Sequence, residues 1–346
     1  MVERRSDDRG AGLLLAAALV AGGALAARAL VRARHSYELR DKVVLITGGS
    51  RGLGLVLARE FASRGSRVVI CARNRDELER ARLDLEGRGA RVLALTCDVT
   101  DRAQVEEMVR YVTREWATVD VLVNDAGVIQ VGPLDTLTIE DYEVAMRTHF
   151  WGPLNAILAV LPQMRARREG RIVNISSVGG KIGVPHLLPY SASKFALTGL
   201  SEGLHAELAR DNVVVTTVCP GLMRTGSPRN AQFKGKHRAE YAWFSIADAL
   251  PVLSTSAESA ARRIVDACRR GDPELTFPLL TRLAVNFNGL FPSVTAGILG
   301  QVNRALPDAG GVGTARVRGA ESQSRVSPSP LTTLGDRAAA SNNELG

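Results

Sequence analysis

The sequence predicts an α/β domain with a doubly wound parallel sheet. Short β-branched runs alternate along the chain with segments of helical pattern. The runs are apolar throughout, as is typical of parallel strands that helices cover on both faces. The chain has 346 residues, of which 45% are hydrophobic and 23% are charged, so it holds enough apolar material for a large buried core.

The expected strands and helices alternate in a regular order. The strands are expected at Val43–Ile46, Arg67–Cys71, Val92–Leu95, Val119–Val123, Arg171–Ile175 and Val213–Val218. The helices are expected at Leu55–Arg64, Asp76–Gly87, Arg102–Ala117, Ile139–Arg167 and Ser191–Asp211. Ligands of such sheets bind at the carboxyl ends of the strands, so the residues that follow each strand should carry the chemistry.

Residues 1–36 precede this domain and contain an uncharged apolar run at residues 10–27. As a helix, the run would be ~27 Å long, just enough to span the hydrocarbon core of a membrane. We expect a single-pass membrane anchor. A cleaved signal peptide, suggested by Ala24-Leu25-Ala26, and a soluble extension are the alternatives. More basic residues follow the run than precede it, which places the following domain on the cytoplasmic side. Without an anchor, the protein would be cytoplasmic.

Two segments follow the main domain, which we place at residues 37–275. Residues 276–306 are apolar and are interrupted by Pro278 and Pro292. We expect them to extend a ligand pocket or to contact lipid. Residues 307–346 are rich in Gly, Ser, Pro and Ala with balanced charge, so we expect a disordered tail.

The net charge of +8 does not indicate a nucleic-acid partner. The excess of basic residues falls in two local segments, residues 1–42 and 224–240, and aromatic residues make up only 5% of the chain. A nucleic-acid groove needs a basic stripe with interleaved aromatic residues. The 4 cysteines are too widely spaced for a CxxC metal or redox site, so no metal site is expected.

The first expected strand runs into a glycine-rich turn, TGGSRGLG at residues 47–54, and then into an apolar helix. Glycines let the backbone pass close to a pyrophosphate, and a helix N-terminus favours an anion. This order predicts a dinucleotide site of the Rossmann type. The second expected strand ends at Cys71-Ala72-Arg73, without an acid to hold a ribose 2′-hydroxyl. Arg51 and Arg73 instead suit a 2′-phosphate, which favours NADP(H) over NAD(H).

Tyr190 and Lys194 form a pair four residues apart on one expected helix. This spacing puts both side chains on one face, one turn apart. An ammonium near a phenol lowers the pKa of the phenol, so the pair predicts an acid–base group. Ser176 and Ser177 follow the fifth expected strand, and either hydroxyl is placed to hydrogen-bond a substrate oxygen.

These motifs resemble those of the short-chain dehydrogenase/reductase family over about residues 40–275. The glycine turn, CDV at 97–99, NDAG at 124–127, the serine pair at 176–177, YSASK at 190–194 and PGLMRT at 220–225 occur in the family's order and spacing. The resemblance implies a catalytic domain that interconverts a carbonyl and an alcohol with NADP(H).

The resemblance also implies roles for single residues. Tyr190 would be the general acid/base, Lys194 would bind the nicotinamide ribose and tune Tyr190, and Ser177 would polarise the carbonyl. The cofactor-binding residues that the resemblance implies are Thr47, Gly48, Ser50, Arg51, Gly52, Leu53, Gly54, Arg73, Asp98, Val99, Asn124, Ala126, Gly127, Tyr190, Lys194, Pro220, Gly221 and Thr225.

Two positions depart from the family pattern. Asp125 stands where the family usually has a second Asn, and it lacks the amide donor. His149 stands where the family has the Asn that holds a proton-relay water. Because a histidine titrates near neutrality, we expect reduced or pH-shifted activity. The alternative is that His149 only packs within its helix.

Residues 226–250 correspond to the substrate lid of the family. They carry basic residues followed by aromatic ones, which suits an acidic head group with an apolar tail or contact with an anionic membrane surface, and a solvated surface loop is the alternative. We expect a lipophilic ketone, aldehyde or alcohol as the substrate. The resemblance implies a homodimer or homotetramer. The rival function, suggested by His149, is a catalytically weak NADPH-binding sensor or scaffold protein.

Overall fold

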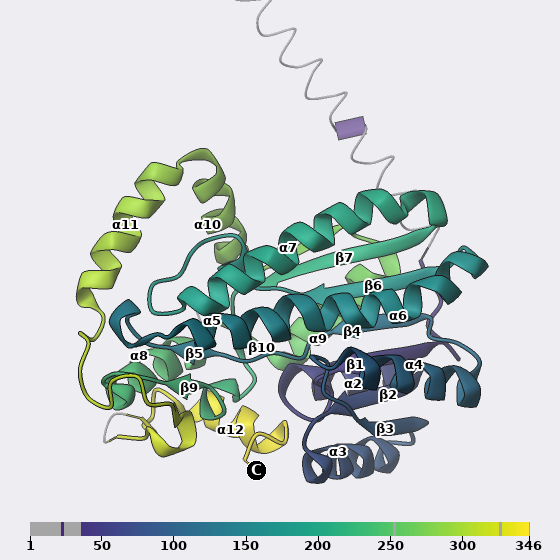
Figure 1. The fold of residues 1–346 in the computed structure, drawn as a ribbon, viewed down its shortest axis with the longest axis horizontal. Coiled ribbons are helices and arrows are strands. Elements are labelled where there is room, and N and C mark those ends of the chain that lie inside the picture. The colour runs from purple at the N-terminus through teal and green to yellow at the C-terminus, as the bar shows by residue number, and fades with distance from the viewer. Residues whose placement is uncertain (1–21, 24–35, 252–253, 325–326, 346) are drawn as a thin grey trace, which may run out of the picture.

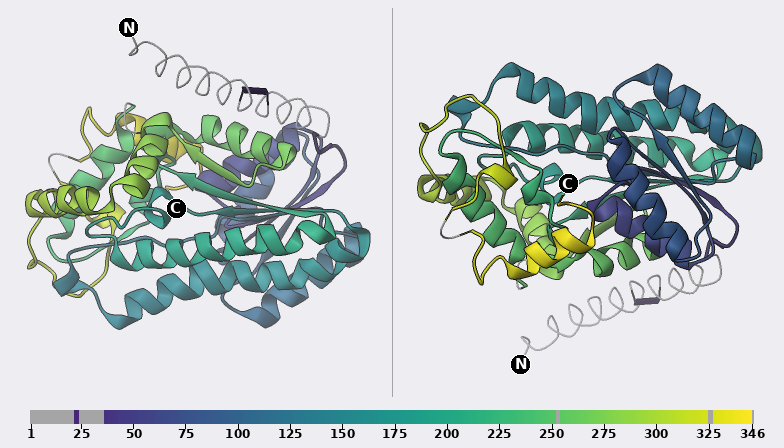
Figure 2. Two further views of the ribbon diagram at one scale, coloured as in Figure 1. Left: turned by 90° about the horizontal axis from the view of Figure 1, so that it is seen from above. Right: turned by 90° about the horizontal axis from the view of Figure 1, so that it is seen from below.

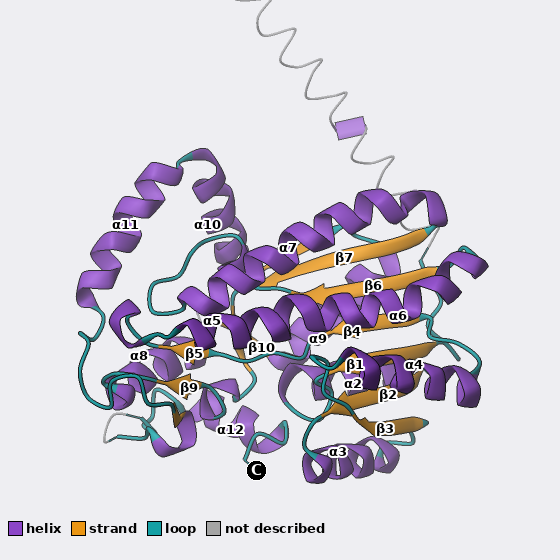
Figure 3. Ribbon diagram, in the orientation of Figure 1, coloured by secondary structure: helices purple, strands orange, loops and turns teal. Residues whose placement is uncertain are grey.

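A seven-stranded sheet with only parallel neighbours forms the centre of the molecule (Figure 1 and Figure 3). The computed structural model describes residues 22–23, 36–251, 254–324 and 327–345. The strand order is β11-β7-β6-β4-β1-β2-β3. The strands are β1 (Val43–Thr47), β2 (Arg67–Ala72), β3 (Val92–Thr96), β4 (Val121–Asn124), β6 (Gly170–Ile175), β7 (Val213–Pro220) and β11 (Glu274–Phe277). The predicted fold class is confirmed, and β11 is an additional strand.

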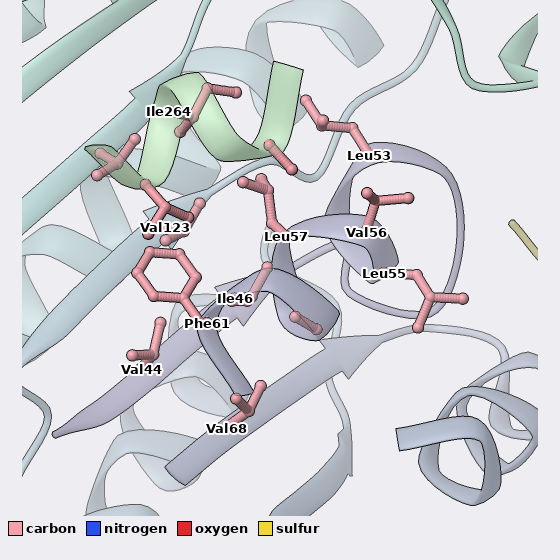
Figure 4. Close-up of a cluster of buried hydrophobic side chains, with 14 of the residues drawn as sticks. Val44, Ile46, Leu53, Leu55, Val56, Leu57, Phe61, Val68, Val123 and Ile264 are labelled. Carbon is pink, nitrogen blue, oxygen red and sulfur yellow. The ribbon is translucent and has the colours of Figure 1, made fainter. Parts of the chain in front are cut away.

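Helices cover both faces of the sheet, as the continuously apolar strands predict. They are α2 (Gly52–Ser63), α3 (Arg75–Gly87), α4 (Arg102–Trp116), α5 (Ile139–Met146), α6 (Gly152–Arg167), α7 (Leu188–Leu208) and α9 (Ala257–Arg270). On one face, Val44 and Ile46 of β1 pack in a cluster with Phe61 of α2 and Ile264 of α9 (Figure 4). On the other face, Leu45 belongs to a cluster that α4 and α6 complete. Consecutive β1 residues are therefore buried on opposite faces.

The single long helix expected at Ile139–Arg167 is divided in two by a π-helical turn. This turn covers Arg147–Trp151 and lies between α5 and α6. Pro153 in the first turn of α6 has no backbone N–H, so it gives no bond to the carbonyl of residue 149. The extra residue of a π turn changes the direction of its side chains. His149 lies within this turn and is buried.

A smaller layer adjoins the carboxyl edge of the sheet. It contains β5 (Gln130–Val131), β8 (Leu222–Arg224), β9 (Gln232–Phe233), α8 (His237–Ala249) and β10 (Ser254–Ser256). Beyond β11, α10 (Leu279–Leu290) and α11 (Pro292–Ala305) project from the body of the protein (Figure 1).

The prediction that residues 307–346 form a disordered tail is wrong for the described part of that segment. It contains β12 (Val317–Arg318) and α12 (Thr333–Ser341), and β12 pairs with β9. Ala339 of α12 is buried against Gly226, which has no side chain to obstruct the approach. The last described residues lie at the lower rim of the molecule in Figure 1, and so they fall near the centre of the views from above and below in Figure 2. Long-range packing orders a segment whose own composition favours disorder.

The predicted anchor at residues 10–27 lies outside the described residues, apart from Gly22 and Gly23. Within the described ranges, no one helix has both the length and the apolar character needed to cross a membrane. The pair α10 and α11 meets those criteria of length and composition together, but the two helices are bent by 120°.

Candidate active site

A cavity of about 710 Å³ opens at the carboxyl ends of the central strands. Its lining comes from the turns after β1, β2, β3, β4, β6 and β7, together with the start of α7. This is the edge at which the parallel sheet predicts ligand binding. The volume falls within the range typical of small-molecule and cofactor sites.

The glycine turn forms one end of this cavity. Gly48 and Gly52 adopt φ values of +74° and +56°, which side chains disfavour. A Cβ on Gly48 would lie 2.8 Å from the Cα of Ala126, and one on Gly54 would overlap the Gly48 carbonyl. The turn is therefore a backbone cradle at the N-terminus of α2. That arrangement suits a pyrophosphate.

Tyr190, Lys194 and Ser177 meet at the other end. The Lys194 Nζ lies 5.6 Å from the centre of the Tyr190 ring and donates to the Ile175 carbonyl at 2.8 Å. Ser177 accepts a hydrogen bond from the Gly179 N–H at 3.0 Å, and its hydroxyl also hydrogen-bonds the Tyr190 phenol. Ser176 instead bonds to α7, through the Lys194 carbonyl and Thr198. Of the two serines, Ser177 is therefore the one beside the phenol.

Burial is the largest cause of the pKa shifts of Tyr190 and Lys194. It raises the pKa of Tyr190 to about 12, against an opposing effect of the Ser177 hydrogen bond. It also lowers the pKa of Lys194, although the Asp125 carboxylate opposes that shift. The expected lowering of the Tyr190 pKa by Lys194 is wrong for the cleft as the structure shows it. At neutral pH the phenol keeps its proton.

His149 is buried, with only 1% of its surface exposed, and it joins the loop after β4 to the first turns of α7. Its Nε2 accepts the Val128 N–H at 3.1 Å, so its Nδ1 carries the ring proton and donates to the Ser193 hydroxyl at 2.7 Å. Ser193 in turn donates to the Tyr190 carbonyl. The ring of His149 also meets the Tyr190 ring edge-on at 5.4 Å. His149 therefore fixes the backbone that carries the phenol.

The expectation that His149 titrates near neutrality is wrong. Burial and the Lys194 ammonium hold the pKa of His149 well below its usual value of 6.5. The imidazole is neutral over the physiological range.

Asp125 lies beside both ends of the cavity. Its carboxylate accepts a hydrogen bond from the Gly54 N–H, and burial raises its pKa against the opposing effect of Lys194. The neighbouring Asn124 amide donates to Asn174 at 2.8 Å. Asp125 thus adds an acid to the floor of the cavity.

Arg51, at the glycine turn, is already paired with acidic side chains. It donates to Glu77 at 2.9 Å, and its Nε lies 3.5 Å from Glu344. Ser50 also donates to Glu77. Glu77 lies on α3, several residues beyond the end of β2, so the residues directly after the strand do not reveal it. Arg73 is exposed at the cavity wall.

Most of the predicted site residues line this one cavity. They are Gly48, Ser50, Arg51, Gly52, Leu53, Arg73, Asp98, Val99, Ala126, Gly127, His149, Ser177, Tyr190, Lys194, Pro220, Gly221 and Thr225. Thr47, Gly54 and Asn124 support it from behind. The Thr47 hydroxyl, for example, accepts the N–H groups of Asp125 and Ala126. Glu77 and Glu344 are lining residues that the sequence analysis missed.

The lid expected at residues 226–250 is more buried than its composition suggests. Lys234 is buried and paired with Asp141. Tyr241 and Phe244 pack on Phe233 in a small core of their own. The interpretation of this segment as a solvated loop is therefore wrong. Its cavity-facing positions include Ala231 and Gln232.

Comparisons with known proteins agree with this geometry. The profile of the short chain dehydrogenases matches residues 42–234. A dehydrogenase/reductase SDR family protein 7-like of Anopheles gambiae is 37% identical over 267 residues, which are 75% of this chain and 83% of the relative.

Two solved structures also resemble the chain. A short-chain dehydrogenase from Streptomyces avermitilis is 30% identical with a TM-score of 0.65, over 77% of this chain and 98% of that one. A single-substitution variant of the actinorhodin polyketide ketoreductase, solved with NADPH, is 31% identical with a TM-score of 0.61, over 68% of this chain and 95% of that one.

Proposed function

Because the chain belongs to the short-chain dehydrogenase/reductase family, we propose that it uses NADP(H) to interconvert a carbonyl and an alcohol on a lipophilic small molecule. The observation that carries the proposal is the shared cavity. One end is a glycine cradle at a helix N-terminus, and the other end holds Ser177, Tyr190 and Lys194. A dinucleotide that spans these ends would bring its nicotinamide to the phenol.

The cradle fits a dinucleotide, because a Cβ on its glycines would fill the space beside the backbone. The turn at residues 48–53 would hold the pyrophosphate, Asp98 and Val99 would flank the adenine, and Lys194 and Thr225 would contact the nicotinamide half. When bound, the cofactor supplies or accepts the hydride.

The protein's own residues would manage the substrate oxygen and its proton. Tyr190 keeps its proton at neutral pH, so it is suited to act as the general acid in carbonyl reduction. The Ser177 hydroxyl, beside the phenol, would donate a second hydrogen bond to the same oxygen. Lys194 would place its charge near the phenolate that forms when Tyr190 gives up its proton. His149 would act as a positioning residue, through Ser193 and the Tyr190 backbone.

The preference for NADP(H) rests on the arginines at the cradle. Arg73 follows β2 at the position where NAD enzymes place an acid. The related ketoreductase was solved with NADPH. Glu77 reduces the free positive charge of Arg51, which leaves Arg73 as the more available cation for a 2′-phosphate.

The substrate end favours an apolar molecule with one polar group. Val128, Ile129 and Met223 line it together with Ala231 and Gln232. In the described part of the chain, the side-chain oxygen of Gln232 is buried without a hydrogen-bond partner. It is a candidate contact for a hydroxyl or amide of the substrate, since a buried acceptor without a partner is costly.

Contact of α10 and α11 with a lipid surface would give the cavity access to an apolar substrate. Residues 283–303 of α10 and α11 contain no charged residue, and Leu290 and Phe291 at the bend are 74% and 51% exposed. An exposed apolar face of this kind is typical of a surface that lies in a membrane interface. Thr281 of α10 touches Gly221, a cavity residue, so the apolar pair begins at the rim of the site. Together with an N-terminal anchor at residues 10–27, it would hold the catalytic domain on the cytoplasmic membrane face.

The helices α6 and α7 present a second apolar surface. Trp151 and Leu158 on or beside α6, and Phe195 on α7, are about half exposed. Their exposure supports association into a homodimer or homotetramer.

Measuring NADPH consumption with a panel of ketones, aldehydes and quinones tests the proposed activity. Turnover of an apolar carbonyl compound is the expected result. NADPH binding without turnover on any member of the panel would favour the rival function of a sensor or scaffold protein, which rests on His149 at the family's Asn position.

A further inference from the structure

Residues 342–344 lie at the cofactor end of the cavity, and Glu344 lines it. The Asn342 carbonyl accepts the Gly52 N–H at 2.9 Å. The Asn343 side chain donates to the Ser50 carbonyl at 2.8 Å and to the Glu77 carbonyl at 3.0 Å. We call residues 341–345 the terminal segment. It is hydrogen-bonded directly to the glycine turn.

The terminal segment accepts a hydrogen bond from a backbone N–H that a bound phosphate would need. The first N–H groups of a helix have no partner within the helix, and for that reason they bind anions. Gly52 is the first residue of α2, and its N–H already donates to the Asn342 carbonyl.

Glu344 brings a carboxyl group to the same place, and burial raises its pKa to about 7, so the group is partly ionised at neutral pH. Its side chain is buried, with 6% exposed, and its Oε1 occupies the space that a Cβ on Gly52 would meet. It lies 3.5 Å from Arg51, which also pairs with Glu77. In its ionised form, Glu344 attracts Arg51, the second of the two arginines near the proposed 2′-phosphate position, and repels the phosphate itself.

Further contacts hold the segment on both sides of the cleft. On one side, Arg59 of α2 donates to the Ser341 carbonyl and to the Asn342 side chain, and Arg80 of α3 donates to Asn343. On the other side, Asn230 donates to Glu344. The helix α12 that precedes the segment packs on α8 and β8. The segment therefore bridges the glycine turn and the lid.

We propose that the terminal segment is an autoinhibitory element that must leave the glycine turn before a dinucleotide binds. The inference rests on the proposed dinucleotide function of the same cavity. It makes the terminal segment a competitor of the cofactor, so any partner that captures this segment would raise the affinity of the protein for NADPH.

Direct measurement of NADPH binding tests this proposal without use of the activity. The dissociation constant is measured from cofactor fluorescence for the full chain, for a chain that ends at Ser341, and for Glu344→Gln. We expect NADPH to bind about tenfold more tightly to the shortened chain and a few-fold more tightly to Glu344→Gln, because several hydrogen bonds and one carboxylate no longer compete. Glu321→Gln removes an exposed carboxylate elsewhere in the C-terminal region and should leave the affinity unchanged.

A second measurement adds a peptide of residues 333–346 to the shortened chain. The peptide should weaken NADPH binding in proportion to its concentration. Equal affinities for the full and shortened chains would overturn the autoinhibition and leave the dinucleotide function intact. Weaker binding to the shortened chain would also overturn it, because the segment would then cover the bound cofactor. Failure of every variant to bind either NADPH or NADH would overturn the proposed function together with this inference.

Discussion

Replacement of His149 by Asn should make the protein less sensitive to acid. The imidazole is neutral in the folded protein because its pKa lies well below 6.5, whereas in the unfolded chain it has its ordinary value. The unfolded state therefore binds more protons below pH 6.5, so the free energy of unfolding falls as the pH falls. The asparagine variant lacks this contribution.

The size of the effect follows from the linkage relation. Each pH unit below the unfolded pKa costs about 1.4 kcal/mol for one proton that only the unfolded state binds. Between pH 7 and pH 5, the wild type should therefore lose up to about 2 kcal/mol more stability than His149→Asn. At pH 7 the imidazole is neutral in the folded state and largely so in the unfolded state, so the two proteins there differ mainly in the lost contacts to Val128 and Ser193.

Urea denaturation at pH 5, 6 and 7 provides the assay. The measured quantity is the difference in the free energy of unfolding between wild type and His149→Asn. The difference should shift steadily in favour of the variant as the pH falls. A constant difference across this range would show that His149 is protonated as easily in the folded protein as in the unfolded chain, and the reasoning from burial would be refuted.

Three other changes test separate parts of the structure. Gly54→Ala should abolish either NADPH binding or folding, because the added Cβ would overlap the Gly48 carbonyl. Calorimetric titration measures the binding and circular dichroism the folding, and wild-type affinity for NADPH would contradict the close packing. Arg73→Asp should lower the ratio of NADPH to NADH affinity by about tenfold or more, and an unchanged ratio when Arg51 is replaced as well would exclude the phosphate contact. Deletion of residues 1–36 should move the protein out of the membrane fraction, and Leu290→Asp should reduce vesicle binding that remains; a full-length protein found in the soluble fraction would refute the anchor.

Local patterns predicted the strands and the cradle because those features depend on short stretches of sequence. The apolar runs identify β1, β2 and β7, and the glycine turn marks its own position between strand and helix. The strand β11 is short and only partly buried, so its residues Glu274–Phe277 give a weak signal.

The remaining features depend on contacts between distant segments. Glu77 reaches Arg51 from the first turn of α3, and Glu344 reaches it from the end of the chain. No regular spacing of residues along the sequence predicts either of these two contacts with Arg51. The depressed pKa of His149 also arises from the residues packed around it, above all from burial beside Lys194. A histidine within a helical sequence pattern indicates neither its burial nor its closeness to a lysine of another helix.

The turnover of Tyr190→Phe tests the proposed chemistry most directly. The variant loses only the phenolic oxygen and its proton, so NADPH should bind with an affinity within about threefold of wild type. With a carbonyl substrate that the wild type reduces, turnover should fall by about 10²–10⁴-fold, the usual contribution of a general acid. Turnover within about threefold of wild type would contradict the assignment of Tyr190 as the proton donor.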